Sequence, residues 1–413
     1  MSTWRKGTWR RAAGGLLKMA ARPVRRAQGR HGTVLEAYRG YGSRQEIFLI
    51  GRVFRQSRPE KVAEDTEIRA ALRDIGRRIR RRRVAGVAVV GRFAGAESRV
   101  FTDRDGYFRI TLNPRQLPSE DVAWHPVDLV VETEPPIHGR CEVFIPTSRC
   151  RTLIISDIDD TVMHTGVANK LKMLWRLFVA DAESRIAFPG AAAFYRALHS
   201  GADGDEGNPM LYVSRAPWGI YDMLSTFFAM HRIPAGPVLF LREWGLSWKR
   251  PLPRRAEDHK RALIGKMLAV YPDLPVVLIG DSGQHDPEVY ARIVEENPGR
   301  VRAVYIRNVS RHAGRIEDVE RLARAVAASG SSLVLAADSV VMAEHAAGIG
   351  LIGQGAVAEV AAGQDLGAPA AEIRTVTAEG LRQLLADEPD APPSLVVEED
   401  GAGAAQGPAP RRA

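Results

Sequence analysis

Two patterns of hydrophobic and polar positions divide the chain near residue 150. Before it, short runs of β-branched and aromatic residues alternate with turn-forming residues, a pattern typical of β-strands. The expected strands of this part are 46–55, 84–93, 106–112, 127–132 and 141–146. Residues 59–83 have a helical composition, and Thr102-Asp-Arg-Asp-Gly106 carries the Asp-Gly signature of a β-hairpin. These features predict a small β-sandwich with one helical excursion.

From residue 152 the pattern changes to apolar strands that alternate with helices. The expected strands are 153–156, 210–213, 238–241, 276–280 and 301–306, and the expected helices are 190–199, 221–231, 257–270 and 287–296. Strands that alternate with helices form a parallel sheet, because each helix returns the chain to the end at which the previous strand began. The predicted fold is therefore α/β, a doubly wound parallel sheet preceded by a small mainly-β sandwich domain.

The patterns divide the chain into five expected segments. These are a basic, amphipathic N-terminal segment at 1–30, a mainly-β domain at 31–150, an α/β domain at 151–325, an Ala/Gly-rich α/β extension at 326–386 and a disordered tail at 387–413.

Composition supports a globular protein in a reducing compartment. The chain has 413 residues, of which 45% are hydrophobic and 26% charged, enough for two or three domains with their own cores. Its two cysteines, Cys141 and Cys150, cannot build a disulfide framework. No apolar run has the length of a secretion signal or a membrane-spanning helix. We therefore expect a cytoplasmic location, with peripheral contact at a membrane as a further option.

The net charge of +9 is unevenly distributed. Residues 1–30 carry many basic and no acidic side chains, and an arginine-rich run follows at 77–83. On a helical wheel, residues 9–22 form an apolar and a basic face, as in a membrane-surface helix; a disordered tail or a helix docked on its own protein are the alternatives. Basic patches suit anionic phospholipids or nucleic acid. The absence of a known nucleic-acid-binding motif favours a phospholipid or membrane surface.

The run Leu153-Ile-Ile-Ser-Asp157-Ile-Asp159-Asp-Thr161 is the clearest chemical signal. Residues two apart in a strand share a face, so Asp157 and Asp159 project toward one site at the carboxyl edge of the sheet. Two adjacent carboxylates resist ionising together unless a cation lies between them or one keeps its proton. The pair therefore indicates a Mg²⁺ site, an acid–base pair, or both.

Further polar residues follow other predicted strands or open helices. Ser214 ends the strand at 210–213, Lys260 lies near the start of a helix, and Asp281 and Asp286 follow the strand at 276–280. Carboxyl ends of adjacent parallel strands meet at one edge, so these side chains should converge on Asp157.

Taken in order, these pieces resemble one family of phosphotransferases. The motifs Asp157-Ile-Asp-Asp-Thr-Val162, Ser214-Arg-Ala-Pro-Trp218, His259-Lys260 and Gly280-Asp-Ser-Gly-Gln-His-Asp-Pro-Glu-Val-Tyr290 are similar to the actin-patch-associated phosphatidate phosphatase catalytic-domain family and its bacterial relatives. This family belongs to the haloacid-dehalogenase (HAD) superfamily. The resemblance covers about residues 150–310 and implies that 151–325 is a HAD-like, Rossmannoid phosphatase domain. It departs at Ala216, where the family often has serine, which concerns substrate detail.

The resemblance also implies roles. Asp157 would be the nucleophile that forms an aspartyl-phosphate, and Asp159 the general acid and then the base. Ser214 and Lys260 would bind the phosphoryl group. Mg²⁺ would bind the carboxylates of Asp157 and Asp281 and the backbone carbonyl of Asp159.

Thr161 and Asp286 would support the site. From the residues alone, other readings stay open: Ser214 as a helix cap, Lys260 as a solvated helix residue, Asp281 as a turn residue, and Asp286 as the N-cap before Pro287.

The substrate is expected to be bulky. Residues 162–188 leave room for a flap or a short helical lid and no large cap domain, and they mix apolar with basic residues. The leading hypothesis is a Mg²⁺-dependent phosphatase that converts phosphatidate to diacylglycerol. The alternatives are a phosphatase for another bulky phosphomonoester, such as a protein or nucleic-acid end, and a non-catalytic lipid-binding adaptor.

Overall fold

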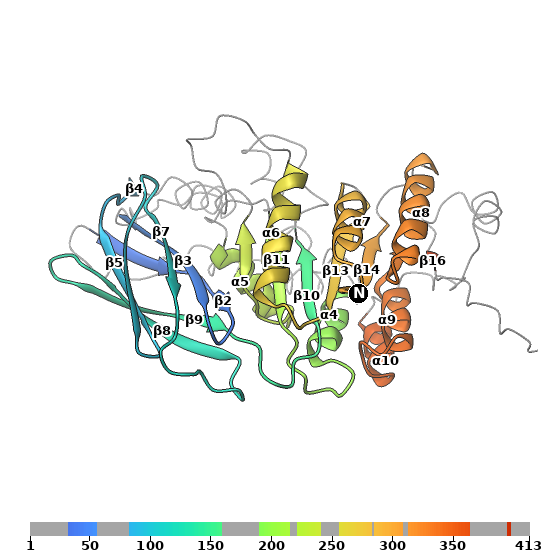
Figure 1. Cartoon of the computed structure of the whole chain (residues 1–413), viewed down its shortest axis with the longest axis horizontal. Helices are drawn as coiled ribbons and strands as arrows, with labels where there is room; N and C mark the ends of the chain where they lie inside the picture. The colour runs from blue at the N-terminus through green and yellow to red at the C-terminus, as the bar shows by residue number, and fades with distance from the viewer. Residues whose placement is uncertain are drawn as a thin grey trace, which may run out of the picture.

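The computed structural model describes residues 32–55, 82–158, 190–214, 221–240, 256–282, 285–308, 313–363 and 395–397. These residues form a β domain and an α/β domain that lie side by side (Figure 1). The predictions for 1–30, for residues 59–81 of the helical excursion, for 162–188 and for residues 364–386 of the extension lie outside the described residues, as do those for the tail apart from 395–397. Residues 82–83, at the end of the predicted helical excursion, form a strand. No described helix has the length and hydrophobicity needed to cross a membrane.

The β domain is built from one nine-stranded sheet. Its strands are β1 (Thr33–Ala37), β2 (Gly40–Gly42), β3 (Ile47–Arg55), β4 (Arg82–Arg83), β5 (Ala88–Phe93), β6 (Ala96–Phe101), β7 (Tyr107–Leu112), β8 (Trp124–Val131) and β9 (Ile137–Phe144). Val53, Phe108, Leu129 and Val143, from four different strands, share one buried core. The expected β content is therefore present, as one continuous sheet around a core in place of two separate sheets.

The Asp-Gly turn at 102–106 does not make the expected hairpin. β6 pairs with β5, whereas β7 pairs with β3, so the two strands on either side of the turn are not hydrogen-bonded to each other. Asp103 holds the loop instead, because its Oδ1 accepts hydrogen bonds from the backbone N–H groups of Asp105 and Tyr107 at 2.9 Å each. A side-chain turn of this kind satisfies the backbone without a strand partner.

The second domain contains a seven-stranded sheet in the order β12-β11-β10-β13-β14-β15-β16. Its strands are β10 (Leu153–Asp157), β11 (Met210–Ser214), β12 (Val238–Phe240), β13 (Val276–Asp281), β14 (Val301–Arg307), β15 (Ser332–Ala336) and β16 (Leu395–Val397). β10 to β15 are parallel and β16 is antiparallel to β15.

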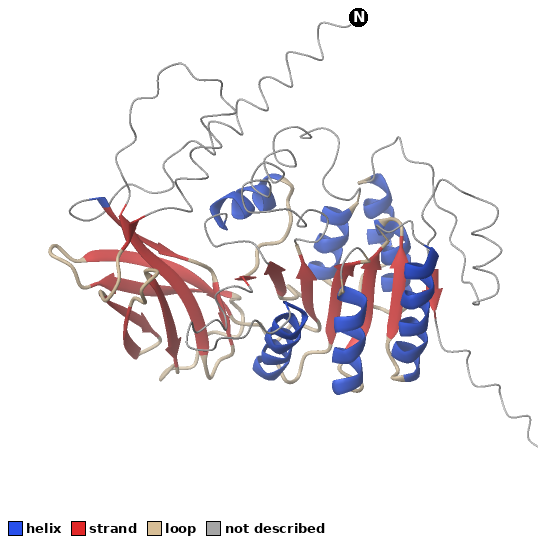
Figure 2. Ribbon diagram, turned by 90° about the horizontal axis from the view of Figure 1, so that it is seen from above, coloured by secondary structure: helices blue, strands red, loops and turns tan. Residues whose placement is uncertain are grey.

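Helices cover both faces of this sheet (Figure 2). They are α4 (Ala191–Ser200), α5 (Tyr221–Met230), α6 (Ala256–Val270), α7 (Asp286–Glu296), α8 (Ala313–Ala328), α9 (Ser339–Gly348) and α10 (Gly355–Ala362). Residues of α4, α5, α9 and α10 share one core with Ile154, and residues of α6, α7 and α8 share another with Leu153 and Ile155. Both faces of β10 are buried, as expected of a parallel strand. A mainly-β region followed by an α/β region is confirmed.

Aromatic side chains join the two domains. The rings of Tyr38 and Tyr221 lie 4.7 Å apart, and the Tyr221 hydroxyl accepts a hydrogen bond from the backbone N–H of Arg39 at 3.1 Å. Tyr41 is buried in the core that contains Tyr271 and Met267. The β domain therefore packs directly against α5, the next described element after Ser214.

Candidate active site

Three of the predicted site residues lie at the carboxyl ends of neighbouring strands, which Figure 1 shows as the arrowheads of the parallel sheet. Asp157 ends β10, Ser214 ends β11 and Asp281 ends β13. β10 pairs with β11 on one side and β13 on the other, with Asp157 opposite Val213 and Ser156 opposite Ile279. The strand order reverses between β10 and β13, and open α/β sheets bind ligands at such a point.

Asp157 lies in a buried group of three charges. The Nζ of Lys260, on α6, is 2.9 Å from Oδ1 of Asp157 and also forms an ion pair with Oδ1 of Asp286. The three side chains are 1 to 3% exposed. Buried charges are tolerated when they are paired, because the attraction between them offsets the cost of removing them from water. The structure thus unites the first, third and fourth motifs.

Lys260 reaches this position because α6 presents one buried face to the sheet. Lys260, Ile264 and Met267 are all 0% exposed and follow the spacing of one helix face. Its Nζ also lies 5.4 Å from the centre of the Tyr290 ring, within the range of a cation–π contact. The reading of Lys260 as a solvated helix residue is therefore wrong.

Asp286 holds the group together from α7. Besides contacting Lys260, its Oδ2 accepts a hydrogen bond from the backbone N–H of Asp281 at 3.4 Å. A Cβ atom on Gly280 would collide with the Asp286 carboxylate, so glycine is needed at that position for this close approach. The N-cap of α7 is His285, and Asp286 is the first helical residue, so the N-cap interpretation of Asp286 is wrong.

Burial and the neighbouring charges change the pKa values of Asp286 and Lys260. Burial raises the pKa of Asp286 to about 6, against the opposing effect of Lys260. Burial by itself would lower the pKa of Lys260, but the charges of Asp157 and Asp286 outweigh it and raise that pKa well above its usual range. Lys260 is therefore a permanent positive charge beside Asp157.

The oxygens of Asp157 suit a metal ion. Within the part of the chain that the structure describes, neither carboxylate oxygen has a hydrogen-bond partner, and Oδ1 is held through the charge of Lys260 alone. This buried carboxylate ends β10, and Asp281 ends the neighbouring strand β13. Carboxylates are the hard oxygen ligands that Mg²⁺ prefers.

The described side chains nevertheless contain no group of three His, Cys, Asp or Glu residues that could hold a metal ion by themselves. Asp159, the remaining predicted ligand and the predicted acid, lies outside the described residues, as does Thr161. The donors that are present fit Mg²⁺, which commonly keeps several waters and uses few protein ligands.

Ser214 is fully buried at the end of β11. The next described helix, α5, begins at Tyr221, and the residues between Ser214 and Tyr221 lie outside the described part of the chain, so the reading of Ser214 as a helix cap stays a prediction. Its place beside the end of β10 agrees with the predicted convergence of the second motif on the first.

Arg307 is a site-edge residue that the sequence reasoning did not single out. It ends β14 opposite Asp281, is 6% exposed and donates a hydrogen bond from Nη2 to Oγ of Ser339 at 2.8 Å. Burial lowers its pKa to about 9, and the nearby Tyr195, Asp338 and Asp281 oppose this shift. The available signal was its position, since it follows an apolar strand as Asp157, Ser214 and Asp281 do.

Comparisons with known proteins concern mainly this domain. Residues 152–308 match the family model of the catalytic domain of phosphatidate phosphatase APP1. Phosphatidate phosphatase APP1 of Saccharomyces cerevisiae is 29% identical over 213 residues, which are 50% of this chain and 34% of the yeast protein. An uncharacterized protein of Schizosaccharomyces pombe is 27% identical over 156 residues, 38% of this chain and 25% of that protein. The chain thus aligns with about a third or less of these relatives.

Among solved structures, a carbohydrate acetylesterase from Xanthomonas citri aligns with 73% of this chain and 68% of the esterase chain, at 11% sequence identity. Its TM-score is 0.26, which supports no inference about this protein. The matched range of the family model includes Asp157, Ser214, Lys260 and Asp281, the same residues that carried the resemblance. Residues 152–308 are therefore similar in sequence to the catalytic domain of phosphatidate phosphatase APP1.

Proposed function

We propose that this protein is a Mg²⁺-dependent phosphatase that hydrolyses phosphatidate to diacylglycerol and phosphate through an aspartyl-phosphate on Asp157. The observation that carries the proposal is the buried group of Asp157, Lys260 and Asp286 at the carboxyl edge of the parallel sheet. It combines a carboxylate nucleophile with a fixed positive charge, which are the two groups that covalent phosphoryl transfer from a dianion needs.

The proposed fold is the doubly wound, HAD-like arrangement. Numbered along the chain, the six parallel strands have the order 3-2-1-4-5-6, and helices lie on both faces. This order supports a ligand site at the end of β10, the strand that carries Asp157.

In the first step, a carboxylate oxygen of Asp157 attacks phosphorus. A bond forms from this oxygen to phosphorus, the bond from phosphorus to the diacylglycerol oxygen breaks, and Asp159 gives its proton to the leaving alkoxide. Lys260 and Ser214 bind phosphoryl oxygens, and Lys260 offsets the negative charge brought together at Asp157.

In the second step, Asp159 takes a proton from water, and the water oxygen attacks phosphorus and releases Asp157. Mg²⁺, held by Asp157, Asp281 and the backbone of Asp159, would supply Lewis-acid stabilisation of the phosphoryl charge. Asp286 and Thr161 touch neither reacting atom in this scheme; Asp286 holds Lys260 in position.

The choice of a lipid substrate rests on the family match and the basic surface of the chain. The yeast relative is named for phosphatidate, and this chain spans 34% of that relative. Phosphatidate lies in a membrane, so the proposed place of action is the cytoplasmic surface of a membrane, where an anionic phospholipid surface is the partner. Both cysteines are free thiols and buried, which suits a reducing compartment.

The test is phosphate release from phosphatidate in mixed micelles, with and without Mg²⁺, by wild type and Asp157→Asn. We expect release by wild type in Mg²⁺ alone, and a loss of at least about a thousandfold in the variant, because the amide is no nucleophile. Hydrolysis of a soluble phosphomonoester such as p-nitrophenyl phosphate without any release from phosphatidate would keep the phosphatase and reject the lipid. No release from either substrate would indicate a non-catalytic adaptor.

A further inference from the structure

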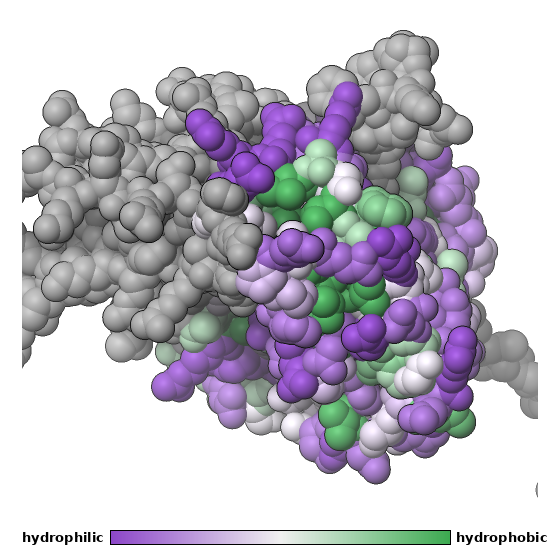
Figure 3. Space-filling view, turned by 90° about the vertical axis from the view of Figure 1, so that its left-hand side faces the viewer, coloured by the Kyte–Doolittle hydropathy of each residue, from purple (hydrophilic) through white to green (hydrophobic). Residues whose placement is uncertain are grey.

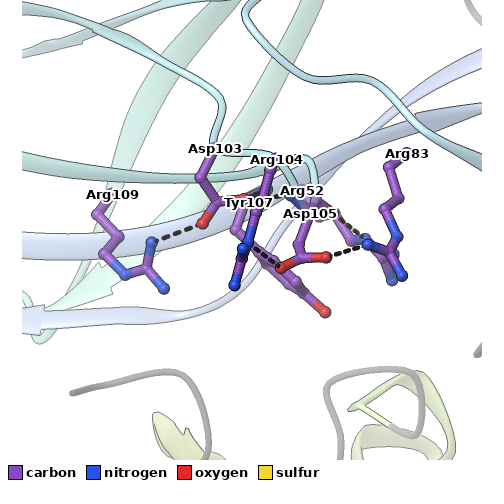
Figure 4. Close-up of polar contacts among 7 residues, drawn as sticks. All are labelled: Arg52, Arg83, Asp103, Arg104, Asp105, Tyr107 and Arg109. Atoms are coloured by element: carbon purple, nitrogen blue, oxygen red, sulfur yellow. Dashed lines mark hydrogen bonds and ion pairs between the residues drawn. The ribbon is translucent and has the colours of Figure 1, made fainter. Parts of the chain in front are cut away.

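A row of arginines lies at one end of the β domain, outside the catalytic group. It consists of exposed side chains on β3, β4, β7 and the loop at 102–106: Arg55, Arg82, Arg83, Arg104 and Arg109. We call these residues the arginine rim. Figure 4 shows Arg83, Arg104 and Arg109 around the carboxylates of Asp103 and Asp105.

The two carboxylates at the rim, those of Asp103 and Asp105, already form hydrogen bonds or ion pairs within the β domain. Asp103 binds the backbone N–H groups of its own loop through Oδ1 and Arg109 through Oδ2 at 3.1 Å. Asp105 pairs with Arg83 at 2.5 Å and with Arg104 at 3.7 Å. Three of the five arginines therefore pair with the two carboxylates, and the described residues of the rim keep an excess of positive charge.

Arg55 and Arg82 carry this excess in an unfavourable place. They lie directly opposite each other in the antiparallel β3–β4 ladder, both exposed, and neither forms an ion pair within the described parts of the chain. Like charges opposite each other in a ladder destabilise a sheet. An external anion placed between them would remove the repulsion.

The loop that carries Arg104 is held in shape. Arg52 is 6% exposed, its Nε donates to the backbone carbonyl of Asp105 at 3.3 Å, and its guanidinium lies 4.8 Å from the centre of the Tyr107 ring. Because these contacts order the loop before a ligand binds, binding does not have to supply the conformational entropy of ordering it, which favours affinity.

An exposed aromatic residue lies next to the rim. Phe101 is 59% exposed, with the Arg99 guanidinium 4.9 Å from its ring centre. The next residue, Thr102, donates a hydrogen bond to the backbone carbonyl of Val84, beside Arg83, at 2.8 Å. Figure 3 shows this end of the molecule, where apolar patches are set among hydrophilic side chains. Basic residues beside an exposed aromatic ring are typical of membrane-surface contacts.

The rim and the catalytic group lie on the same side of the molecule. In Figure 1, β4 lies at the upper end of the β domain, and the arrowheads of β10 and β11 point to the same upper side. Tyr107, which follows the rim loop, is buried in one core with Tyr221 of α5. A flat anionic surface that contacts the rim would therefore approach the molecule from the side to which the carboxyl ends of β10 and β11 point.

We infer that the arginine rim docks the β domain on an anionic membrane surface, through lipid phosphates between Arg55 and Arg82 and insertion of Phe101. The inference deepens the proposed function, because it names the surface on which the lipid substrate is presented. Binding itself requires no turnover, so it is measured on lipids that are not phosphomonoesters.

The experiment is co-sedimentation of the full chain with phosphatidylcholine vesicles, with and without phosphatidylglycerol. We compare wild type with R55Q/R82Q and with the control pair R115Q/R151Q. Arg115 and Arg151 are also exposed and without an ion pair in the described chain, but Arg115 follows the far end of β7 and Arg151 precedes the amino end of β10.

We expect R55Q/R82Q to bind phosphatidylglycerol vesicles about 30-fold more weakly, since each basic residue near an anionic surface contributes about 1 kcal/mol and 1.4 kcal/mol is tenfold. The control pair should bind like wild type, and binding of wild type should fall with added salt. R55Q/R82Q should fold with an unchanged or higher Tm, because it removes a like-charge pair.

Hydrolysis of a soluble phosphomonoester should be the same in all three proteins, since no rim residue contacts the catalytic group. Equal binding by R55Q/R82Q and wild type, or an equal loss in both pairs, would overturn the inference. Tighter rim-dependent binding to a DNA duplex than to vesicles at the same salt would overturn it in favour of nucleic acid. Vesicle binding by wild type without hydrolysis of phosphatidate or of a soluble phosphomonoester would reject the proposed function and keep this inference. Hydrolysis by wild type with equal vesicle binding by wild type and R55Q/R82Q would reject this inference and keep the proposed function.

Discussion

At the scale of single residues, Lys260 supplies the positive charge that balances the two buried carboxylates of the site. It occupies an apolar helix face with Ile264 and Met267, and its charge is balanced by Asp157 and Asp286. Removal of one member of a buried charged group leaves the others without compensation, which costs more than the loss of a surface pair. The group is therefore sensitive to changes that a neighbouring exposed position tolerates.

We expect Lys260→Met to lower the free energy of unfolding by about 3–5 kcal/mol, because it leaves two buried carboxylates unpaired. The next residue supplies the control: Arg261 pairs with Glu296 at the surface, and Arg261→Met should cost at most about 1 kcal/mol. Urea unfolding followed by circular dichroism measures both. Equal losses in the two variants would contradict a special role for the buried group.

At the scale of elements, the site depends on the close approach of α7 to β13. The strand ends in Gly280 and Asp281, and the helix begins with Asp286, whose carboxylate lies over Gly280. The absence of a side chain at Gly280 lets the start of α7 lie against the end of β13. The end of the strand carries the predicted metal ligand Asp281, and the start of the helix carries Asp286, the partner of Lys260.

Gly280→Ala should lower both stability and phosphatase activity, since its Cβ atom would displace the Asp286 carboxylate from Lys260. Overpacking of this kind costs about 1–3 kcal/mol. Gly265→Ala is the matched change, because Gly265 lies within α6 with open space around it, and alanine there should stabilise the helix by about 0.5–1 kcal/mol. Thermal unfolding and the rate of phosphate release test the pair. Full activity in Gly280→Ala would contradict the steric argument.

At the scale of the whole molecule, the β domain and the α/β domain share buried aromatic contacts. Tyr38 and Tyr107 of the β domain lie in one core with Tyr221 and Phe228 of α5. A shared core of this kind joins two domains into one cooperative unit, because neither can unfold without exposing apolar surface of the other. It also fixes the position of the β domain, which carries the arginine rim, relative to the α/β domain, which carries the catalytic group.

Tyr221→Ala should therefore separate the unfolding of the two domains. The loss of a buried aromatic ring costs about 3–5 kcal/mol, and we expect one calorimetric transition in wild type to become two. Tyr221→Phe keeps the ring and removes only the acceptor for the Arg39 N–H, so it should cost about 1 kcal/mol and keep one transition. A single transition in Tyr221→Ala would show that the interface does not couple the domains.

The sequence by itself determined the alternation of strands and helices after residue 152 and the chemistry at its strand ends. Buried parallel strands must be continuous apolar runs, and Asp157, Ser214 and Asp281 interrupt this pattern where each strand ends. The periodicity of single segments was therefore sufficient to place them at one edge. Lys260 was identified by its motif. Its position on the same helix face as Ile264 and Met267 could have indicated that it is buried.

Only the tertiary structure decided which segments meet. Periodicity describes the faces of a strand, not its partners, so the Asp-Gly turn predicted a hairpin although β6 and β7 pair elsewhere. Likewise, Arg55 and Arg82 belong to distant segments, and nothing local shows that β3 and β4 place them opposite each other. Strand pairing is set by the packing of the complete core, because a strand can exchange partners without changing its own pattern of inward and outward residues.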